Sequence, residues 1–123
     1  LNRQLSYRQT DKALRTAAYM GASAKFAMPA AVAAIFNHFD RILKYEALLT
    51  RKPNPSSEEK SAALGVSPYF FKEYDAAVRN YPLKRCMSII ALLRDYDFKG
   101  KGGDSGEATA PELLTELITK ILQ

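Results

Sequence analysis

The sequence has few of the residues that covalent and metal chemistry require. Its 123 residues include one cysteine, Cys86, and one histidine, His38. A single thiol excludes an internal disulfide, and an intracellular, cytoplasmic setting is the simpler inference. One histidine, without a second histidine or cysteine at ligand spacing, gives no metal-binding pattern. We therefore expect no metal site and no cofactor.

Long apolar runs and a leader sequence are also missing. No stretch is long and apolar enough to span a bilayer, and no signal peptide is visible. We therefore expect no membrane partner. The chain starts at Leu1 in a polar run without a methionine, which suggests an excised piece of a longer protein.

The composition is that of an ordinary globular chain. Hydrophobic residues make up 47% and charged residues 25% of the sequence, and its length fits one domain over residues 1–123. The balance of 18 Lys and Arg against 13 Asp and Glu gives a formal net charge of +5. This excess favours acidic partners without identifying one.

Apolar residues recur at helical spacing along most of the chain, and no segment has the pattern of a strand. The longest periodic segment opens at Pro29, and Thr109 begins a capping-box pattern with Pro111 and Glu112. After Pro82 we expect one buried helix face made of Leu83, Cys86, Met87, Ile90 and Leu93. The pattern predicts an all-α fold, a single bundle of about five or six helices.

A helical hairpin is expected over residues 57–80. Ser57 is a natural N-cap for the first helix, and Gly65 ends it with its permissive backbone. Ser67 and Pro68 suit the start of the second helix. Its buried face is expected to contain Phe71, Tyr74 and Val78.

Two functions fit such a hairpin. A DNA-reading helix-turn-helix would place donor side chains at the start of its second helix, in the major groove. This sequence has Tyr69 and Phe70 there, and Glu73 and Asp75 follow, where carboxylates would repel phosphates. Packing of two helices within a larger bundle is therefore favoured, and the DNA-binding module is the alternative.

A family resemblance rests on the same residues. The run Ala63 to Lys72, the Arg79-Asn80-Tyr81 corner and the helix end 93–99 resemble the C-terminal region of the delta subunit of the bacterial DNA polymerase III clamp loader. That family has a Leu-Gly-Val-x-Pro-Phe hairpin, an Arg-Asn-Phe-type corner, a helix and an Asp-x-x-Leu-Lys-x-Gly-type loop. The residues that carry the match, to which we assign structural roles, are Leu64, Gly65, Val66, Pro68, Phe71, Lys72, Arg79 and Asn80. Phe98 and Pro82 depart from the family pattern.

The resemblance implies that residues 1–123 are the C-terminal collar domain of a delta subunit. In that family the collar joins neighbouring subunits into a pentameric ring that places the sliding clamp on DNA during replication. The implied partners are the ATPase subunits and delta-prime. The sliding clamp would be reached through the missing N-terminal domain, and DNA only indirectly or weakly. The parent holoenzyme is a DNA-directed DNA polymerase, a nucleotidyltransferase, but the matched residues imply no catalysis in this fragment.

Candidate site residues are few. We expect no catalytic residue, because Cys86 lies on an apolar face as an inert thiol and His38 is typical of a packed or surface residue. The glycine-rich segment 99–108 lacks phosphate-loop spacing, so we interpret it as a flexible connector. The aromatic residues are too many for one small core, and aromatics are enriched at interfaces. We therefore expect an assembly surface that includes Tyr69, Tyr96 and Lys99.

Overall fold

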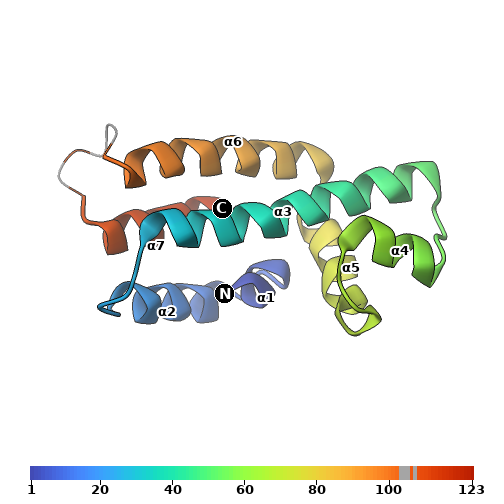
Figure 1. Ribbon diagram of the computed structural model, residues 1–123, viewed down its shortest axis with the longest axis horizontal. Helices are drawn as coiled ribbons and strands as arrows, with labels where there is room; N and C mark the ends of the chain where they lie inside the picture. The colour runs from blue at the N-terminus through green and yellow to red at the C-terminus, as the bar shows by residue number, and fades with distance from the viewer. Residues whose placement is uncertain (103–105, 107) are drawn as a thin grey trace.

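The computed structural model describes residues 1–102, 106 and 108–123 (Figure 1). Over these residues the chain forms seven α-helices, one 3-10 turn and no strand, which confirms the all-α prediction with slightly more helices than expected. None of these helices is both long and apolar enough to cross a membrane. The elements are α1 (Asn2–Ser6), α2 (Thr10–Gly21), α3 (Met28–Arg51), α4 (Ser57–Leu64), η1 (Pro68–Phe70), α5 (Phe71–Asn80), α6 (Leu83–Gly100) and α7 (Ala110–Leu122).

Helix α3 is the centre of the bundle. Helix α6 runs antiparallel along it, α7 packs against both, and α2 packs mainly on α7 (Figure 1). The antiparallel pair is close where α6 ends, because a Cβ atom on Gly100 would lie 2.7 Å from Cγ of Met28. Helices α4 and α5, with the short α1 against α5, form the opposite end of the molecule, which we call the hairpin end.

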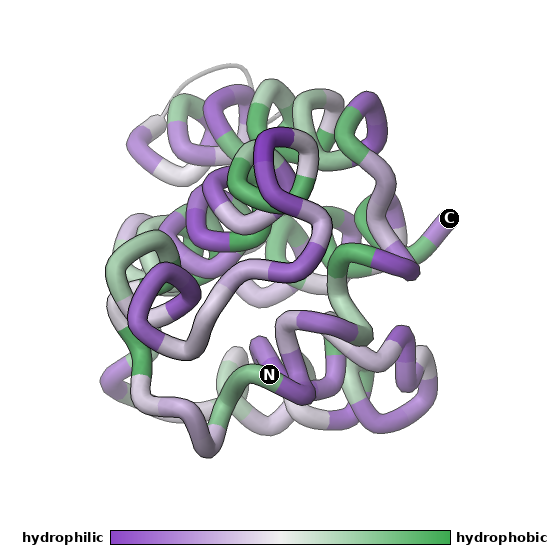
Figure 2. Tube along the Cα trace, turned by 90° about the vertical axis from the view of Figure 1, so that its right-hand side faces the viewer, coloured by the Kyte–Doolittle hydropathy of each residue, from purple (hydrophilic) through white to green (hydrophobic). Residues whose placement is uncertain are grey.

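One hydrophobic core connects the helices. Hydrophobic and hydrophilic residues alternate along each helix (Figure 2), as expected for amphipathic helices that share a core. Helix α7 contributes a broad buried stripe of six leucine and isoleucine side chains: Leu113, Leu114, Leu117, Ile118, Ile121 and Leu122. The largest fully buried side chains are Tyr45, Tyr81, Tyr96, Phe39, Leu5, Met28, Ile35, Ile42, Leu64, Ile89, Leu93 and Leu114.

The start of the hairpin differs by one residue from the expectation. Ser56, not Ser57, is the N-cap of α4, and its hydroxyl accepts a hydrogen bond of 3.2 Å from the backbone N–H of Glu59. The Glu59 carboxylate accepts one of 3.0 Å from the N–H of Ser56. Ser57 could not form the same capping box, because the residue three positions later is Lys60, whose side chain has no hydrogen-bond acceptor. Gly65 ends α4 in the left-handed region at φ 66°, as predicted.

The second helix of the hairpin starts later than expected. Pro68 opens the 3-10 turn η1, with a backbone bond of 3.0 Å from the Phe70 N–H to the Ser67 carbonyl, and α5 begins at Phe71. Ser67 precedes the turn without a capping hydrogen bond from its side chain. Phe71 is the first buried side chain, and Tyr74 and Ala77 continue the buried face. Tyr69 and Phe70 therefore lie before α5 and not on its first turn.

The buried face of α6 is rotated from the one expected. Leu83 is 49% and Met87 57% exposed, and Ile90 is half-buried. Cys86 and Leu93 are buried as predicted, but Ile89 and Tyr96 complete the face. The helix contacts both α3 and α7. Packing against these two helices therefore determines which side of α6 is buried, and the middle of its apolar stripe does not.

Candidate interaction site

A chain of buried polar side chains links three helices at the hairpin end. The Ser6 hydroxyl lies 2.6 Å from Nε2 of His38, and Nδ1 of His38 lies 3.2 Å from the Tyr74 hydroxyl. In the neutral ring one nitrogen donates and the other accepts, so both contacts are satisfied. Burial, with the Arg41 guanidinium adding to it, lowers the pKa of His38 from 6.5 to about 4. His38 therefore stays neutral near neutral pH.

This serine and histidine pair is not an accessible active site in this conformation. Ser6 is 0% and His38 2% exposed, so a substrate would not reach either group. Over the described residues, no group of three or more histidine, cysteine or acidic side chains is placed to hold a metal ion. The chain of contacts from α1 through α3 to α5 instead holds these helices together.

The residues that carry the family resemblance lie around this region. Leu64 and Phe71 are buried, Val66 packs against the core, and Lys72 and Arg79 are exposed. At the corner between α5 and α6, the Asn80 side chain donates a hydrogen bond of 2.9 Å to the Ser6 carbonyl. The next residue, Tyr81, donates one of 2.6 Å from its hydroxyl to the Leu5 carbonyl. The corner thus fixes α1 to the rest of the bundle.

Two aromatic side chains of the hairpin project into solvent. Tyr69 is 79% and Phe70 43% exposed, and their rings stack edge to face with centroids 5.1 Å apart. They border a cleft of about 170 Å³ between η1, α5 and α1. Its other lining residues are Arg3, Tyr7, Lys72 and Glu73. Large exposed rings beside cations are typical of interaction surfaces.

The other two candidates for the assembly surface lie elsewhere. Tyr96 is fully buried, so the prediction that it belongs to an exposed assembly surface is wrong. Its ring fills the core, and its hydroxyl donates a hydrogen bond to the Glu116 carboxylate. Lys99 is partly exposed and covers that ring, with Nζ 4.7 Å from the centroid. Both residues belong to the end of α6 far from η1, where Tyr69 lies (Figure 1). Tyr69 therefore shares its surface with Phe70 and not with Lys99.

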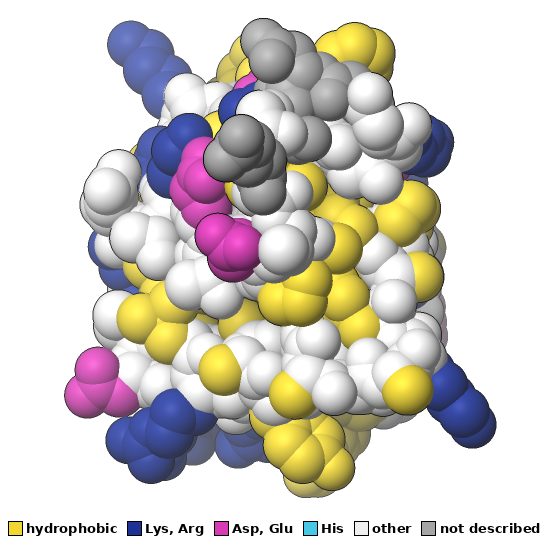
Figure 3. All heavy atoms as spheres, turned by 90° about the vertical axis from the view of Figure 1, so that its left-hand side faces the viewer, with side chains coloured by type: hydrophobic (Ala, Val, Ile, Leu, Met, Phe, Trp, Pro, Cys, Tyr) yellow, Lys and Arg dark blue, Asp and Glu magenta, His cyan; other side chains and the backbone are white. Residues whose placement is uncertain are grey.

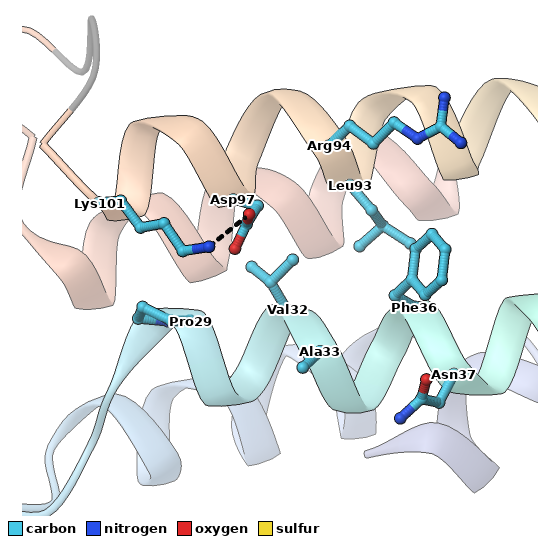
Figure 4. A pocket seen from close by; sticks show the side chains of 9 residues that line it. All are labelled: Pro29, Val32, Ala33, Phe36, Asn37, Leu93, Arg94, Asp97 and Lys101. Carbon is cyan, nitrogen blue, oxygen red and sulfur yellow. Dashed lines mark hydrogen bonds and ion pairs between the residues drawn. The ribbon is translucent and has the colours of Figure 1, made fainter.

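A groove between α3 and α6 was not anticipated from the sequence. It has a volume of about 430 Å³, and its nine lining side chains come from both helices and from Lys101, which directly follows α6 (Figure 4). Phe36 and Leu93 point toward one another at its floor, beside Val32. On its rim Lys101 pairs with Asp97 at 2.9 Å. The signal available in the sequence was the width of the apolar stripe of α6, because Leu83 and Met87, which were expected on its buried face, are exposed beside the arc that the fold covers.

Other apolar side chains are exposed at the end of the bundle opposite the hairpin. Tyr19 is 83% and Phe98 61% exposed. Tyr19 also borders a hollow of about 430 Å³ with Met20 and Phe26. Figure 3 shows hydrophobic side chains gathered across this end, with Lys and Arg side chains at its margins. The molecule therefore has apolar surface at several places.

The single thiol is buried, as expected. Cys86 is 0% exposed, and its S–H donates to the Tyr81 carbonyl at 3.5 Å. Burial raises the pKa of the Cys86 thiol to about 12, and the nearby Glu46 carboxylate adds to this. A thiol with such a pKa is scarcely ionised at neutral pH, so it is a poor nucleophile.

Several basic side chains have internal partners. Arg8 donates to the Leu122 carbonyl, and Arg85 donates to the Ile121 carbonyl at 3.1 Å and to the Lys120 carbonyl. Cations at a helix C-terminus satisfy free carbonyls and oppose the helix dipole. The lysines that form ion pairs with carboxylates are Lys44, Lys52, Lys99, Lys101 and Lys120. The positive charge is therefore partly neutralised in place by these contacts.

The glycine-rich segment 99–108, expected to be a flexible connector, lies partly outside the described residues. The proposed connector includes Gly103, Asp104, Ser105 and Glu107, which lie outside them. Before it, α6 continues to Gly100 and so takes in the first two residues of that segment. After it, Thr109 caps α7 with the predicted capping box, in which Glu112 is the partner.

The class that the fold defines is an all-helical bundle with exposed aromatic and apolar surfaces. Comparisons of the chain with protein-family models, curated proteins and solved structures found no match. The function is therefore argued from the residues and their geometry.

Proposed function

We propose that this chain is the collar domain of a DNA polymerase III delta subunit, which joins neighbouring subunits of the cytoplasmic clamp loader. The observation that carries the proposal is the role of the residues that resemble the family. Gly65 shapes the hairpin turn, Leu64 and Phe71 anchor its helices, and Asn80 fixes the following corner to α1. A sequence pattern that sets a hairpin and a corner supports a shared helical scaffold.

The pair Tyr69 and Phe70 supports an assembly role for this scaffold. Both rings are large and partly or largely exposed, and they contact each other edge to face. Rigid aromatic side chains lose little conformational entropy when a partner covers them, so they are frequent anchors in interfaces. In this proposal ATP hydrolysis and clamp binding belong to other parts of the assembly.

The DNA-reading alternative has less support from the geometry. A recognition helix needs donors on its first turn, but α5 begins with the buried Phe71. Lys72 is exposed beside Glu73, whose carboxylate lines the same cleft. A sequence-specific reader also needs a positive face toward the phosphates. We keep duplex binding as an outcome of the test.

The test is reconstitution with the purified ATPase subunits and delta-prime of the same cell's clamp loader. Size-exclusion chromatography after mixing is expected to give a stable complex, and duplex DNA titrated in parallel is expected to bind weakly and to dissociate with salt. The paired substitution Tyr69→Ala with Phe70→Ala is expected to weaken the complex. Tyr19→Ala is the matched control, because Tyr19 is equally exposed at the other end of the molecule.

Two results would contradict the proposal. The first is no complex with any of these subunits. The second is tight, sequence-dependent duplex binding, which would make the hairpin a DNA reader. A complex that survives the paired substitution would keep the collar function and remove Tyr69 and Phe70 from its interface.

A further inference from the structure

The apolar face of α6 is wider than the fold covers. Cys86, Ile89 and Leu93 are buried, yet Leu83 is 49% and Met87 57% exposed on the same helix. Leucine and methionine gain free energy when they leave water, and single exposed examples are common on protein surfaces. Here the exposed residues instead continue a pattern of i, i+4 and i+7 spacing with the half-buried Ile90. Such a stripe is the usual signature of helix packing.

The exposed stripe continues into the groove between α3 and α6. Counting on from Ile90 by steps of three or four residues gives Arg94, Asp97 and Lys101, and all three line the groove. Helical spacing therefore places Leu83, Met87 and Ile90 on the same side of α6. The whole face extends along the 18 residues of α6. At 1.5 Å per residue this is about 27 Å, or five helical turns.

Helix α3 supplies the second wall of this groove. Gly100 lies against Met28, which fixes the two helices as antiparallel. Phe36 lines the groove opposite Leu93, and Leu43 follows seven residues later on the same side of α3. The antiparallel register places Leu43 near the first half of α6, where Met87 is exposed. Two parallel walls with an apolar floor fit a third helix better than an extended strand.

The charges of the groove favour one kind of occupant. Asp97 is neutralised by Lys101, and on α3 Asp40 is neutralised by Lys44 at 3.0 Å. Arg94, an exposed groove residue, has no ion-pair partner among the described residues. The groove therefore carries an excess positive charge on its rim. A second copy of this chain, with a net charge of +5, would be repelled as a whole.

We propose that the groove between α3 and α6 docks an amphipathic helix with an acidic flank from a partner protein. The partner's apolar stripe covers Met87, Ile90 and Phe36, and one of its carboxylates meets Arg94. This site goes beyond the proposed function, because it is separate from the Tyr69 and Phe70 surface and does not depend on which assembly the chain joins. The two surfaces would allow the domain to contact two partners at once.

Two synthetic peptides of about 18 residues, matched to the length of α6 and so to the groove together with the exposed stripe, test the inference. Both carry leucines at i, i+3, i+4 and i+7. One has glutamates on the flanks of that stripe and the other has lysines. Binding of each peptide to the whole chain is measured by fluorescence anisotropy. The glutamate peptide is expected to bind at least about tenfold tighter than its lysine twin, because only it complements Arg94.

Three variants locate the peptide. Met87→Glu and Arg94→Glu are each expected to weaken binding of the glutamate peptide by at least about tenfold. Lys84→Glu is the control for Arg94→Glu, since it makes the same change of charge on an exposed residue of α6 that belongs neither to the groove lining nor to the stripe of Leu83, Met87 and Ile90. All three positions are exposed, so the variants are expected to fold, and circular dichroism checks this.

The possible results show whether the groove binds an acidic amphipathic helix, a second copy of the chain or neither. Tight binding of the glutamate peptide that Met87→Glu and Arg94→Glu weaken, and Lys84→Glu does not, supports the inference. Equal binding of the two peptides, or binding that the groove variants leave unchanged, overturns it. Failure of the folded chain to bind either peptide also overturns it. Concentration-dependent dimerisation that Met87→Glu abolishes would assign the groove to a second copy instead.

Discussion

The two ends of the bundle are held together by different means. At the hairpin end, buried hydrogen bonds from His38 and Tyr81 and a partly buried one from Asn80 connect α1 with α3, α5 and the corner before α6. At the opposite end, helices approach closely at glycine: Gly100 lies against Met28, and a Cβ on Gly21 would lie 2.9 Å from Cβ of Pro111. The stability that buried polar contacts provide depends on the protonation of the groups and on every group having a partner. The stability that close packing provides depends only on the fit between side chains. The hairpin end should therefore respond to mild acid, and the other end to side-chain volume added at its glycines.

The largest effect is expected at the Tyr81 anchor. Tyr81→Ala removes a fully buried ring and its hydrogen bond to the Leu5 carbonyl, and should lower the free energy of unfolding by about 4 kcal/mol. Tyr81→Phe keeps the ring and should cost about 1 to 2 kcal/mol, because the carbonyl loses its partner. Urea unfolding measures both. Equal costs for the two variants would show that the hydrogen bond and not the ring holds this end.

The second effect is a loss of stability in mild acid. Below pH 6.5 the unfolded chain takes up a proton on His38, whereas the folded chain resists it until about pH 4. Stability from this group is thus complete above pH 6.5 and falls as the pH drops toward 4. Between pH 7 and pH 5 the loss should be about 2 kcal/mol.

The control for this pH effect is His38→Gln. Glutamine can donate and accept hydrogen bonds but does not titrate. Burial raises the pKa of Glu46 and Glu73, so their protonation favours the folded chain as the pH falls and opposes the effect of His38. The variant should be less stable than the parent at pH 7 and should not lose stability down to pH 5. Urea unfolding at both pH values measures this. A variant that loses as much stability as the parent would assign the acid sensitivity to other groups.

A smaller effect is expected at the glycine contact of the other end. In an exposed helix, replacing glycine by alanine usually stabilises by up to about 1 kcal/mol. Gly100→Ala should instead destabilise by about 1 to 2 kcal/mol, because the new Cβ would lie 2.7 Å from Cγ of the buried Met28. Thermal unfolding measures the sign. In a double-mutant cycle with Met28→Ala the cost should disappear, and its persistence would place the strain elsewhere.

The smallest effect concerns the polar contact of that same end. Tyr96→Phe leaves the buried ring in place and removes the hydroxyl that donates to Glu116, a surface carboxylate that also pairs with Lys120 at 3.3 Å. The loss should be about 1 kcal/mol. It should show no step between pH 7 and pH 5, in contrast to the His38 chain. A cost as large as that of Tyr81→Ala would remove the distinction between the two ends.

Local signals predicted the parts of the fold that depend on neighbours in sequence. Gly65 ended a helix because its left-handed backbone conformation is costly for other residues. Thr109 and Glu112 formed the expected capping box, because both partners lie within one turn. The one-residue error at Ser57 had the same origin, since two serines compete there and only Ser56 has an acceptor three residues later.

The contacts between helices could not be predicted from such local signals. Ser6 and His38 lie 32 residues apart, and His38 and Tyr74 lie 36 apart, so their pairing exists only after the helices have packed. The rotation of α6 was predicted wrongly because its apolar stripe is too wide to show which side faces the core. In the structure Met87 is exposed and Ile89 is buried. Tyr69 and Lys99 were grouped as neighbours, but the rigid length of α6 carries Lys99 to the far end of the molecule.

The buried thiol of Cys86 makes the protein convenient for site-directed labelling. With its pKa raised to about 12, only about one molecule in ten thousand carries the thiolate at pH 8, and that sulfur is shielded from reagents. A cysteine introduced on the surface would have an ordinary pKa and would react far faster. Single dyes or spin labels can therefore be attached beside Tyr69 or beside Met87 without first removing the native cysteine. The hairpin surface and the groove can each be observed separately in one otherwise unaltered chain.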